Sequence, residues 1–458
     1  MHMKAKIERF FELKEKGTSI PTELLAGLTT FLTMAYILVV NHNILSIAGM
    51  DWGAVFTATA LSSIFTTLML ALYAKYPFAA APGMGINAFF AFTIGLTFGW
   101  QIALIAVFVE GILFILLSLM NIREAIFEAI PKNLKLAVGA GIGLFISFIG
   151  FVNGGVVVAN IPDATVTMGD LSSITVVLTL AGIVITMALF GLKVRGALLW
   201  GIILTWFAGI VCQLTGLYIV NAEAGMHSLI PSGIFSPPPP VAGFTVFSAL
   251  KHVSSGFGVG IFEFIVIMFA FLFVDVFDTI GAIIGLSEKA GLIDEYGKLP
   301  RVKQIFLSDA AGTVVGAALG TSTVTTYIES AAGIAVGGKT GLTALAVSVL
   351  FAIALFFSPI FSAIPVFATA PALVLVGFFM LQSITKIDFS DPTEGIPAFF
   401  AIVMMPLTYN IAEGIVFGVL SYVMLKLITG KREDISAVMG VIAVLFVLRF
   451  ISQAVLGY

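Results

Sequence analysis

Apolar runs of about 20 residues recur along the whole chain, and a run of this length can cross the hydrocarbon core of a bilayer as one helix. Hydrophobic residues make up 59% of the 458 residues and charged residues only 10%, and the mean hydropathy is +1.12. Typical soluble domains carry about 25% charged residues. The sequence therefore predicts an all-α polytopic membrane protein that forms a single membrane domain.

Fourteen crossing segments are predicted, in two sets of seven, and the third segment of each set is interrupted by polar or helix-breaking residues. The first set comprises 24–47, 52–74, the interrupted 77–98, 101–120, 134–152, 174–190 and 197–218. The second set comprises 257–286, 305–319, the interrupted 320–336, 342–357, 371–383, 396–407 and 411–428.

Lysine and arginine residues predict the orientation, because they concentrate in cytoplasmic loops. With the N-terminus inside, only Lys251 and Arg449 of the 22 basic residues fall on the wrong side or are ambiguous. The charged, amphipathic stretch 1–20 is then a cytoplasmic interfacial helix, and 221–251 is an extracytoplasmic loop. The apolar stretch 434–458 is additional to the two sets, and its sidedness stays open.

The interrupted segment of the second set carries six Ser or Thr residues and one carboxylate, Glu329, between Gly320 and Gly333. This polar, β-branched run predicts a short extended segment, followed by a short helix with Glu329 in its first turns. Irregular backbone at membrane depth is tolerated only where protein buries it or where it lines a polar cavity. We therefore expect Glu329 to face a central polar site.

The counterpart in the first set, 81–90, contains Pro82, Gly83 and Gly85 and leads into a short helix. Repeats of seven segments place the two halves in opposite orientations. Paired broken segments at matching positions indicate a transporter site between inverted repeats. The N-termini of both short helices would then meet at the membrane midplane and offer unpaired N–H groups. A helix-packing motif or a simple kink is the alternative explanation for 81–90.

Acidic residues inside predicted spans are the candidates for chemistry, because ionisable side chains in a membrane are costly and usually functional. Asp275 and Asp278 are three residues apart and share one helix face, with Thr279 beside them. Together with Glu329 they are predicted to bind a polar ligand and to hold a proton, because neighbouring carboxyls in a low-dielectric cavity do not readily ionise together. The alternative is a structural hydrogen bond to a neighbouring helix. That alternative is favoured for two further acids, Glu110 and Glu263.

Asn87 of the first broken segment supplies both a hydrogen-bond donor and an acceptor. The aromatic side chains of Tyr36, Phe89 and Phe90 could stack on a planar ligand. In a chain with 42 phenylalanines, however, each ring is more readily explained as a core or lipid-facing residue.

Several classes of function are disfavoured. Cys212 is the only cysteine, which excludes a disulfide framework, and His2, His42, His227 and His252 do not follow a metal-ligand spacing. No nucleophile–base pair, phosphate loop or basic, aromatic-rich patch stands out. We therefore expect neither an enzyme nor a nucleic-acid-binding protein, and no cofactor or metal.

Five stretches resemble the AzgA-like purine permeases for adenine, guanine and hypoxanthine, which belong to the nucleobase:cation symporter superfamily. The resemblance covers nearly the whole chain and is carried by 27–36, 81–90, 274–281, 320–333 and 337–343. One departure is Asn41-His42, where family members usually have Asn-Pro. Loss of this proline removes a kink or helix stop, so we expect altered stability or gating there rather than altered specificity.

The resemblance implies fourteen segments in 7+7 inverted repeats, with two short strand-plus-half-helix segments at the third and tenth positions. A core domain would comprise 24–125 and 252–358, and a gate domain 130–220 and 363–430. Members of this family are thought to move the core against the gate like an elevator, with proton symport. The base would bind between the two half-helices.

The resemblance also implies a set of site residues by motif position. Glu329 and Asp275 would face the nucleobase, and Asp278 would support them. Protons would be carried by these three carboxyls. The other substrate-binding positions are Asn87, Ala88, Thr279, Ser330 and Tyr36.

The predicted function is proton-coupled uptake of purine bases across the cell (inner) membrane. A same-fold carrier of uracil, xanthine or an inorganic anion is one alternative, but no intramembrane Lys or Arg accompanies the acids to hold an anion. A channel and an intramembrane protease are the others. Asp275 and Asp278 lie on one helix and do not supply the protease's paired motif on two helices. Monomer and homodimer both stay open.

Overall fold

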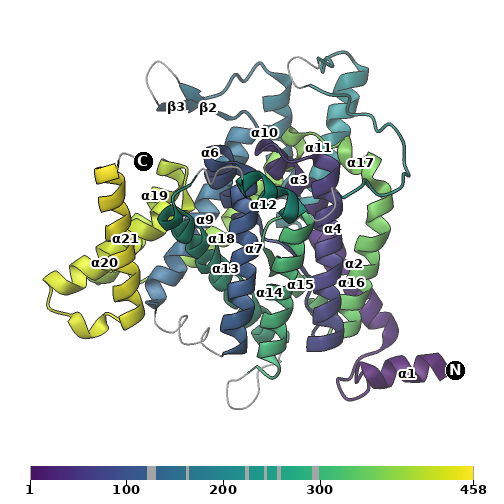
Figure 1. Ribbon diagram of the computed structural model, residues 1–458. Coiled ribbons are helices and arrows are strands. Elements are labelled where there is room, and N and C mark those ends of the chain that lie inside the picture. Colours follow the sequence, from purple (N-terminus) through teal and green to yellow (C-terminus); the bar gives the residue numbers. More distant parts are fainter. Residues whose placement is uncertain are drawn as a thin grey trace.

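The computed structural model describes residues 2–120, 130–160, 165–221, 226–241, 245–254, 259–290 and 299–456, and it is predominantly helical (Figure 1). Nine helices in these ranges are long and apolar enough to cross a membrane. This confirms a helical membrane protein, whereas the count of fourteen crossings stays a prediction. The basic inner loops predicted at 123–135 and 289–303 lie largely outside the described residues.

Within the described residues, the first half contains ten α-helices, two π-helical turns (η1, η2) and three strands. They are α1 His2–Phe10, α2 Ile20–Met34, α3 Ile37–Ile47, α4 Trp52–Met69, η1 Leu70–Ala74, β1 Ala80–Pro82, α5 Met84–Ala88, η2 Phe89–Gly95, α6 Leu96–Phe98, α7 Trp100–Leu119, α9 Lys132–Asn153, β2 Val157–Asn160, β3 Thr165–Met168, α10 Ile174–Gly191 and α11 Ala197–Leu214.

The second half begins after the long loop and ends near the C-terminus. Its elements are α12 Thr245–Ser254, α13 Ile261–Ala290, α14 Val302–Leu319, β4 Val324–Thr326, α15 Ser330–Ala335, α16 Gly341–Ala354, η3 Leu355–Phe357, α17 Ser358–Ser362, α18 Val366–Leu381, η4 Gln382–Lys386, α19 Pro392–Thr408, α20 Ile411–Ile428, η5 Arg432–Asp434 and α21 Ala437–Leu456.

Two short strands from opposite halves of the chain pair in the middle of the helices. β1 and β4 are antiparallel, with Ala81 opposite Thr325. Beyond the strands, the Gly83 N–H donates to the Thr323 carbonyl at 3.0 Å, and the Tyr327 N–H donates to the Ala79 carbonyl at 2.9 Å. The pair therefore satisfies backbone groups that would otherwise be unpaired inside the membrane. It also brings the starts of α5 and α15 together.

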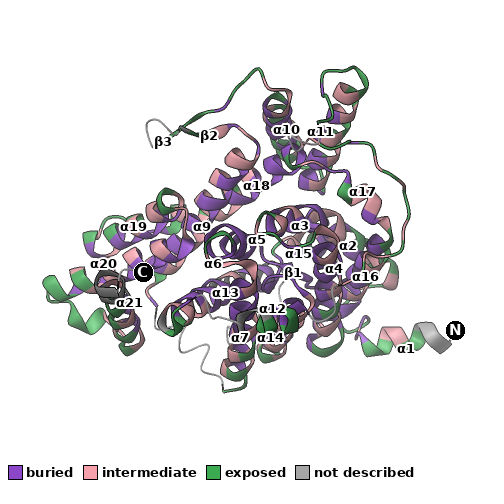
Figure 2. Cartoon of the chain, turned by 45° about the horizontal axis from the view of Figure 1, so that its top comes forward, coloured by how far each residue is buried: buried purple, intermediate pink, exposed green. Residues whose placement is uncertain are grey.

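The helices pack as two groups (Figure 2). One group consists of α9, α10, α11, α18, α19 and α20. The other consists of α2, α3, α4, α7, α14, α15 and α16, and it surrounds the strand pair. The long helix α13 contacts α5, β4 and α15 and also reaches α9 and α20. The strand pair thus belongs to one group, with its neighbour α13 at the boundary with the other.

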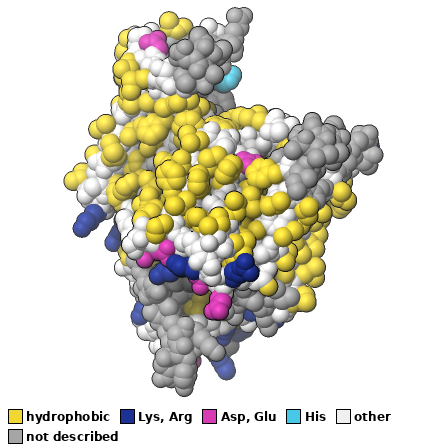
Figure 3. Space-filling view, turned by 90° about the vertical axis from the view of Figure 1, so that its left-hand side faces the viewer, with side chains coloured by type: hydrophobic (Ala, Val, Ile, Leu, Met, Phe, Trp, Pro, Cys, Tyr) yellow, Lys and Arg dark blue, Asp and Glu magenta, His cyan; other side chains and the backbone are white. Residues whose placement is uncertain are grey.

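One face of the molecule carries a broad belt of hydrophobic side chains, and most of its Lys and Arg side chains lie below this belt (Figure 3). Leu204, Phe207 and Val211 on α11 are examples of large apolar side chains that are exposed on single helices. An apolar belt with charged residues beyond its edge is what a bilayer environment requires.

Three local features differ from the sequence expectations. The first predicted span lies within one apolar stretch, Ile20–Ile47, that is long enough to cross a membrane, but a turn at Ala35–Tyr36 divides it into α2 and α3. The loop predicted at 221–251 contains the start of α12. The loop after α9 contains the antiparallel strands β2 and β3, which periodicity did not indicate.

Candidate functional site

Both half-helices begin directly after the paired strands. On the first side, Pro82 has no N–H to continue a helix, and α5 starts after Gly83, which is extended with φ −70° and ψ 127°. On the second side, α15 starts after Glu329. α5 and α15 thus start from opposite ends of one antiparallel strand pair.

Each strand is anchored by one buried threonine from a neighbouring helix. Thr67 on α4 accepts from the Ala80 N–H at 3.0 Å and donates to the Ala80 carbonyl at 3.1 Å. Thr313 on α14 makes the same two bonds with Val324, both at 3.2 Å. A hydroxyl can both donate and accept, so one side chain satisfies both backbone groups of a strand residue.

Two further buried side chains hold the second strand. Asp309 on α14 accepts from the Thr326 N–H at 3.2 Å and from the Thr326 hydroxyl at 2.9 Å. Asn41 on α3 donates to Thr59 at 2.6 Å and to Thr321 at 2.9 Å. Buried polar groups of this kind are stable only when they are hydrogen-bonded. The extended backbone before α15 is therefore held from both sides.

Glu329 lies at the start of α15 and is partly exposed. The hydroxyl of Tyr36, which is 1% exposed, donates to its Oε1 at 2.8 Å. Thr33 donates to the Glu329 carbonyl at 3.4 Å. The turn that separates α2 from α3 thus places Tyr36 against the carboxyl of Glu329. The neighbouring Ile328 is 59% exposed, so the tip of this half-helix is open on one side.

Asp278 lies at the start of the other half-helix. Thr325 of β4 donates to its Oδ2 at 3.3 Å. A Cβ atom built on Gly83 would lie 3.2 Å from the same oxygen, so a larger residue there would push the carboxyl a few tenths of an ångström from the start of α5. The carboxyls of Asp278 and Glu329 also interact electrostatically with each other. The structure therefore brings one carboxyl to the start of each half-helix.

The other predicted site residues lie in the surrounding framework. Asp275 is completely buried, and Thr279, one turn along α13, donates to its Oδ1 at 3.2 Å. Asn87 is also completely buried and accepts from Ser322 across the strand pair. Ser330 accepts from the Ala79 N–H at 3.0 Å. The last of these residues is Ala88, which is 2% exposed.

Two residues beside the carboxyls were not among the predicted site residues. Thr325 contacts Asp278, and the hydroxyl of Tyr327 donates to the Pro82 carbonyl at 2.6 Å. Tyr327 therefore links the second strand to the end of the first. The only signal in the sequence is that both lie in the same polar run as Glu329.

The stretch Gly-Gly-Lys-Thr-Gly-Leu-Thr at 337–343 folds around the carboxylate of Glu23 on α2. Its completely buried carboxylate accepts the N–H groups of Lys339, Thr340 and Thr343 at 3.0, 3.2 and 3.2 Å. It also accepts the hydroxyls of Thr340 and Thr343 at 2.8 and 2.7 Å. A loop of successive N–H groups is a typical anion-binding arrangement. Here the anion is internal, and it fixes the connection between α15 and α16.

Comparisons with known proteins agree with this architecture. Residues 21–417 match the model of a family described as the permease family. The guanine/hypoxanthine permease PbuO of Bacillus subtilis is 44% identical, over 95% of this chain and 98% of its own length. The adenine permease AdeP of Escherichia coli is 40% identical, over 97% of this chain and 96% of its own length.

The transmembrane domain of the cyanobacterial bicarbonate transporter BicA has the same fold. It superposes with a TM-score of 0.61 at 13% identity and covers 87% of this chain and 97% of that domain. The relatives matched over nearly their full length are permeases rather than enzymes. The chain therefore belongs to the permease family, in which its relatives at 40–46% identity include the adenine and guanine/hypoxanthine permeases.

Proposed function

We propose that the protein takes up purine nucleobases together with protons, and that the base binds between the starts of α5 and α15. The observation that carries this proposal is the pair of carboxyls, Asp278 and Glu329, at the two half-helix starts. The relatives indicate the substrate class, because AdeP is an adenine permease and PbuO is a guanine/hypoxanthine permease.

The chemistry of a purine base suits such a site. Its N–H groups are donors that a carboxylate can accept, and its ring nitrogens and carbonyl oxygens are acceptors. The first N–H groups of a helix have no partner within that helix, so the start of α5 can donate to the base. Tyr36 would orient Glu329, and Thr325 would orient Asp278.

The framework residues would keep the site in shape. Asn87 and Ser330 tie the two broken segments together. Asp275 and Thr279 lie on the helix that carries Asp278. We propose that these four residues and Ala88 support binding, and that Asp275 is a second candidate for the proton.

Proton coupling is proposed because each half-helix start in the membrane carries a carboxyl, Asp278 at one and Glu329 at the other. Desolvation and mutual repulsion oppose ionisation of both at once, so one would be neutral when the site is occupied. A proton taken up on one side of the membrane and released on the other would couple the two fluxes.

The movement would be an elevator-type displacement of a core domain against a gate domain, in a fold of 7+7 inverted repeats. The separate packing of the two helix groups supports this division, with 24–125 and 252–358 as core and 130–220 and 363–430 as gate. The charge distribution supports a cytoplasmic N-terminus in a cell (inner) membrane. Both a monomer and a homodimer are compatible with this movement.

The same fold also carries an anion in BicA, so an anion is the rival substrate. In the described residues the hydrogen bonds to the carboxyls of Glu329 and Asp278 come from Tyr36 and Thr325, and neither carboxyl is paired with Lys or Arg. Two carboxyls would repel an anion, and this favours the nucleobase over bicarbonate or sulfate.

The test is uptake of labelled adenine, guanine, hypoxanthine and uracil into proteoliposomes, with and without an imposed proton gradient. We expect uphill purine uptake that the collapse of the proton gradient abolishes and that excess bicarbonate does not inhibit. Glu329→Gln and Asp278→Asn should abolish uptake, whereas Glu15→Gln in the exposed N-terminal segment should not. Wild-type uptake by Glu329→Gln, or uptake driven by sodium instead of protons, would refute the corresponding part of the proposal.

A further inference from the structure

A cavity of about 200 Å³ lies away from the two carboxyls, between η2–α6, the start of α13 and the start of α20. Its lining combines aromatic and polar side chains, among them Phe89, Phe98, Thr97, Glu263 and Asn410. With the N-terminus inside, the ends of these helices face the extracytoplasmic side. The cavity is thus on the side from which an imported base arrives.

The polar groups of this cavity can serve both kinds of atom in a base. Glu263 is in the first turn of α13, and its carboxylate can accept N–H groups. The Oδ1 of Asn410 accepts the Ala412 N–H at 2.8 Å, so the NH₂ group of the same amide remains as a donor. Thr97 donates to the Thr93 carbonyl at 2.8 Å and keeps its lone pairs as acceptors.

Phe98, which is partly exposed, offers its ring to the flat face of a base, whereas the ring of Phe89 is fully buried in the wall of the cavity. Phe89 and Phe98 lie at the two ends of the helix that continues α5, and both line the cavity. Base–aromatic stacking is worth about 1–3 kcal/mol per base in proteins that bind single-stranded nucleic acid. A planar heterocycle with N–H donors therefore matches this lining better than an acyl chain does.

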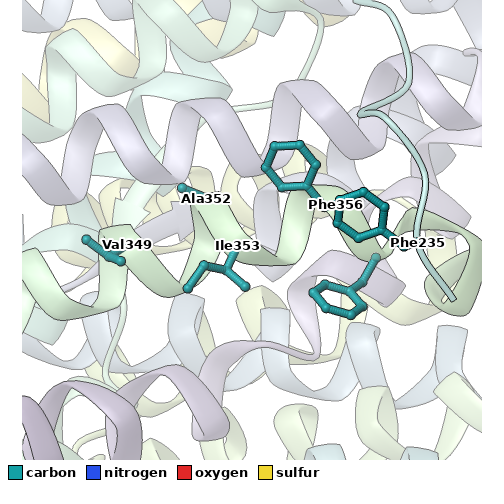
Figure 4. Close-up of a pocket in the computed structure, with 6 residues that line it drawn as sticks. Phe235, Val349, Ala352, Ile353 and Phe356 are labelled. Atoms are coloured by element: carbon teal, nitrogen blue, oxygen red, sulfur yellow. The ribbon is translucent and has the colours of Figure 1, made fainter.

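A second pocket, of about 280 Å³, differs from this cavity because only apolar side chains line it (Figure 4). It lies on α16, and Phe235, Val349, Ala352, Ile353, Phe356 and Phe357 line it. The rings of Phe235 and Phe356 stack with their centroids 5.4 Å apart. All of these side chains are apolar, so this pocket offers no hydrogen bond to a base.

A row of side chains along α13 runs from the outer cavity toward the carboxyls of the proposed site. Glu263, Ile267, Phe271 and Asp275 follow one another at intervals of four residues, so each lies beside the next, and the row turns by about 120° around the helix from Glu263 to Asp275. At about 1.5 Å of rise per residue, Glu263 lies about 18 Å along the helix from Asp275. Phe271 packs edge-on against Phe89, with the ring centroids 4.8 Å apart. This aromatic pair separates the cavity from the deeper carboxyl.

The cavity is also bounded by a contact between the two helix groups. Thr93 on η2 donates to the Tyr409 carbonyl at 3.4 Å, and the Phe92 ring meets the Tyr409 ring edge-on at 5.9 Å. Tyr409 ends α19 in the left-handed region, with φ +55°, a conformation that non-glycine residues adopt only when contacts hold it. The cavity therefore lies where a movement of one group against the other would open or close it.

We propose that this cavity is a second, outer nucleobase subsite, in which the base is held by Glu263 and Asn410 before it passes the Phe89–Phe271 pair. This inference rests on the proposed function, because it assumes that the transported solute is a purine. It adds a binding step on the extracytoplasmic side that does not use Glu329 or Asp278.

The test compares binding and uptake in the full-length protein, with labelled hypoxanthine and adenine as probes. Glu329→Gln removes the deep site, and we expect it to retain weak binding. Addition of Glu263→Gln should weaken this residual binding about tenfold, which corresponds to one hydrogen bond to a charged group. As a single variant, Glu263→Gln should raise the KM of uptake about tenfold with little change in kcat. Asp170→Asn, an exposed outer carboxylate away from the cavity, is the matched control.

Ala412→Leu provides a second route to the same answer, because Ala412 lines the cavity and a larger side chain would fill it. Added to Glu329→Gln, it should remove the residual binding. It therefore tests the outer subsite independently if the Glu263→Gln variant does not fold. The outer subsite is overturned if Glu329→Gln binds no purine, or if its residual binding is the same with and without these second changes. Failure of the wild-type protein to take up purines would instead overturn the proposed function, so the two failures are distinguishable.

Discussion

Replacement of Glu23 by alanine should destabilise the protein severely, although this residue is far from the carboxyls at the half-helix starts. Its carboxylate accepts five hydrogen bonds, of which three come from backbone N–H groups in the connection between α15 and α16. Alanine would leave all five donors without this acceptor. The two threonine hydroxyls can rotate toward other acceptors, and the Thr343 N–H also donates to the Thr340 carbonyl, whereas the buried N–H of Thr340 cannot turn to another acceptor.

The magnitude follows from the burial of these N–H groups. Those of Thr340 and Thr343 are buried, whereas Lys339 is an exposed residue whose N–H can turn to water. The Thr343 N–H also donates to the Thr340 carbonyl at 3.2 Å, so the Thr340 N–H is the buried backbone donor that alanine would orphan, at a cost of about 1–3 kcal/mol. Loss of the Glu23 acceptor for the Thr343 N–H and for the two hydroxyls adds about 0.5–1.5 kcal/mol for each bond. Proteins are stable by about 5–15 kcal/mol, and the loss is therefore a large share of the total.

Glu23→Gln removes the negative charge of the side chain but keeps an oxygen that can accept hydrogen bonds, so it separates the two contributions to stability. Four of the five donors reach Oε2, so an amide oxygen in that place keeps four bonds and loses only the one from Lys339. We expect a cost of about 1–3 kcal/mol, because hydrogen bonds to a neutral acceptor are weaker.

The assay is thermal unfolding of the purified protein in detergent. The unfolding temperature should fall in the order wild type, Glu23→Gln, Glu23→Ala. Uptake should fall in the same order, because the connection that follows α15 and the start of α16 lose their hydrogen bonds to α2. Glu15→Ala in the exposed N-terminal segment is the control and should behave as wild type. If Glu23→Ala unfolds at the temperature of this control and transports normally, the reasoning from buried N–H groups is wrong.

Three further predictions concern the site, the cytoplasmic face and the packing. Tyr36→Phe removes the hydroxyl that holds the carboxyl at the start of α15 and should lower uptake about tenfold, the equivalent of one hydrogen bond; unchanged uptake would contradict this role. The hydrogen bond from Lys75 holds the pKa of Glu12 below its usual value. At a pH above the usual pKa this ion pair stabilises the fold, and the stabilisation is lost as the pH falls through the lowered pKa. The unfolding temperature of wild type should therefore decrease more steeply than that of Glu12→Gln below about pH 5. Gly341→Ala should prevent folding, because the added Cβ would lie 2.0 Å from the backbone oxygen of Ala71 in η1. Gly191→Ala is the control and should be harmless, because there is open space around Gly191. The yield of folded protein measures both effects.

The positions of the long apolar helices were predictable from the sequence. The segment predicted at 411–428 coincides with α20, and the one at 174–190 ends one residue before α10 does. Apolar length is a local property, so no long-range information is needed. The break between α2 and α3 could not be found in this way, because Ala35 and Tyr36 are not helix breakers. Tyr36 at this break contacts Glu329, 293 residues away in the sequence, and apolar length carries no signal for such a contact.

The two broken segments were also visible, because proline, glycine and clustered Ser or Thr stand out in an apolar chain. Their pairing as β1 and β4 agrees with the strand-plus-half-helix expectation. The partners of individual side chains were not predictable. Asp309 is a further acid of the second half inside a predicted span, and hydropathy gives it the same weight as Asp275. Only the structure places it against Thr326.

The number of donors around the carboxyl separates Glu23 and Asp309 from the two carboxyls that we propose bind the base. Glu23 accepts five hydrogen bonds and Asp309 accepts from both the N–H and the hydroxyl of one threonine, so their lone pairs are used to hold backbone in place. Among the described residues, Glu329 and Asp278 each accept one hydrogen bond from another side chain. An ionised carboxyl has about four acceptor positions. The remaining capacity at these two residues lies at the starts of two half-helices, where a ligand with N–H donors could use it. Acidic residues that look equivalent in a hydropathy profile thus differ in the property that matters for binding.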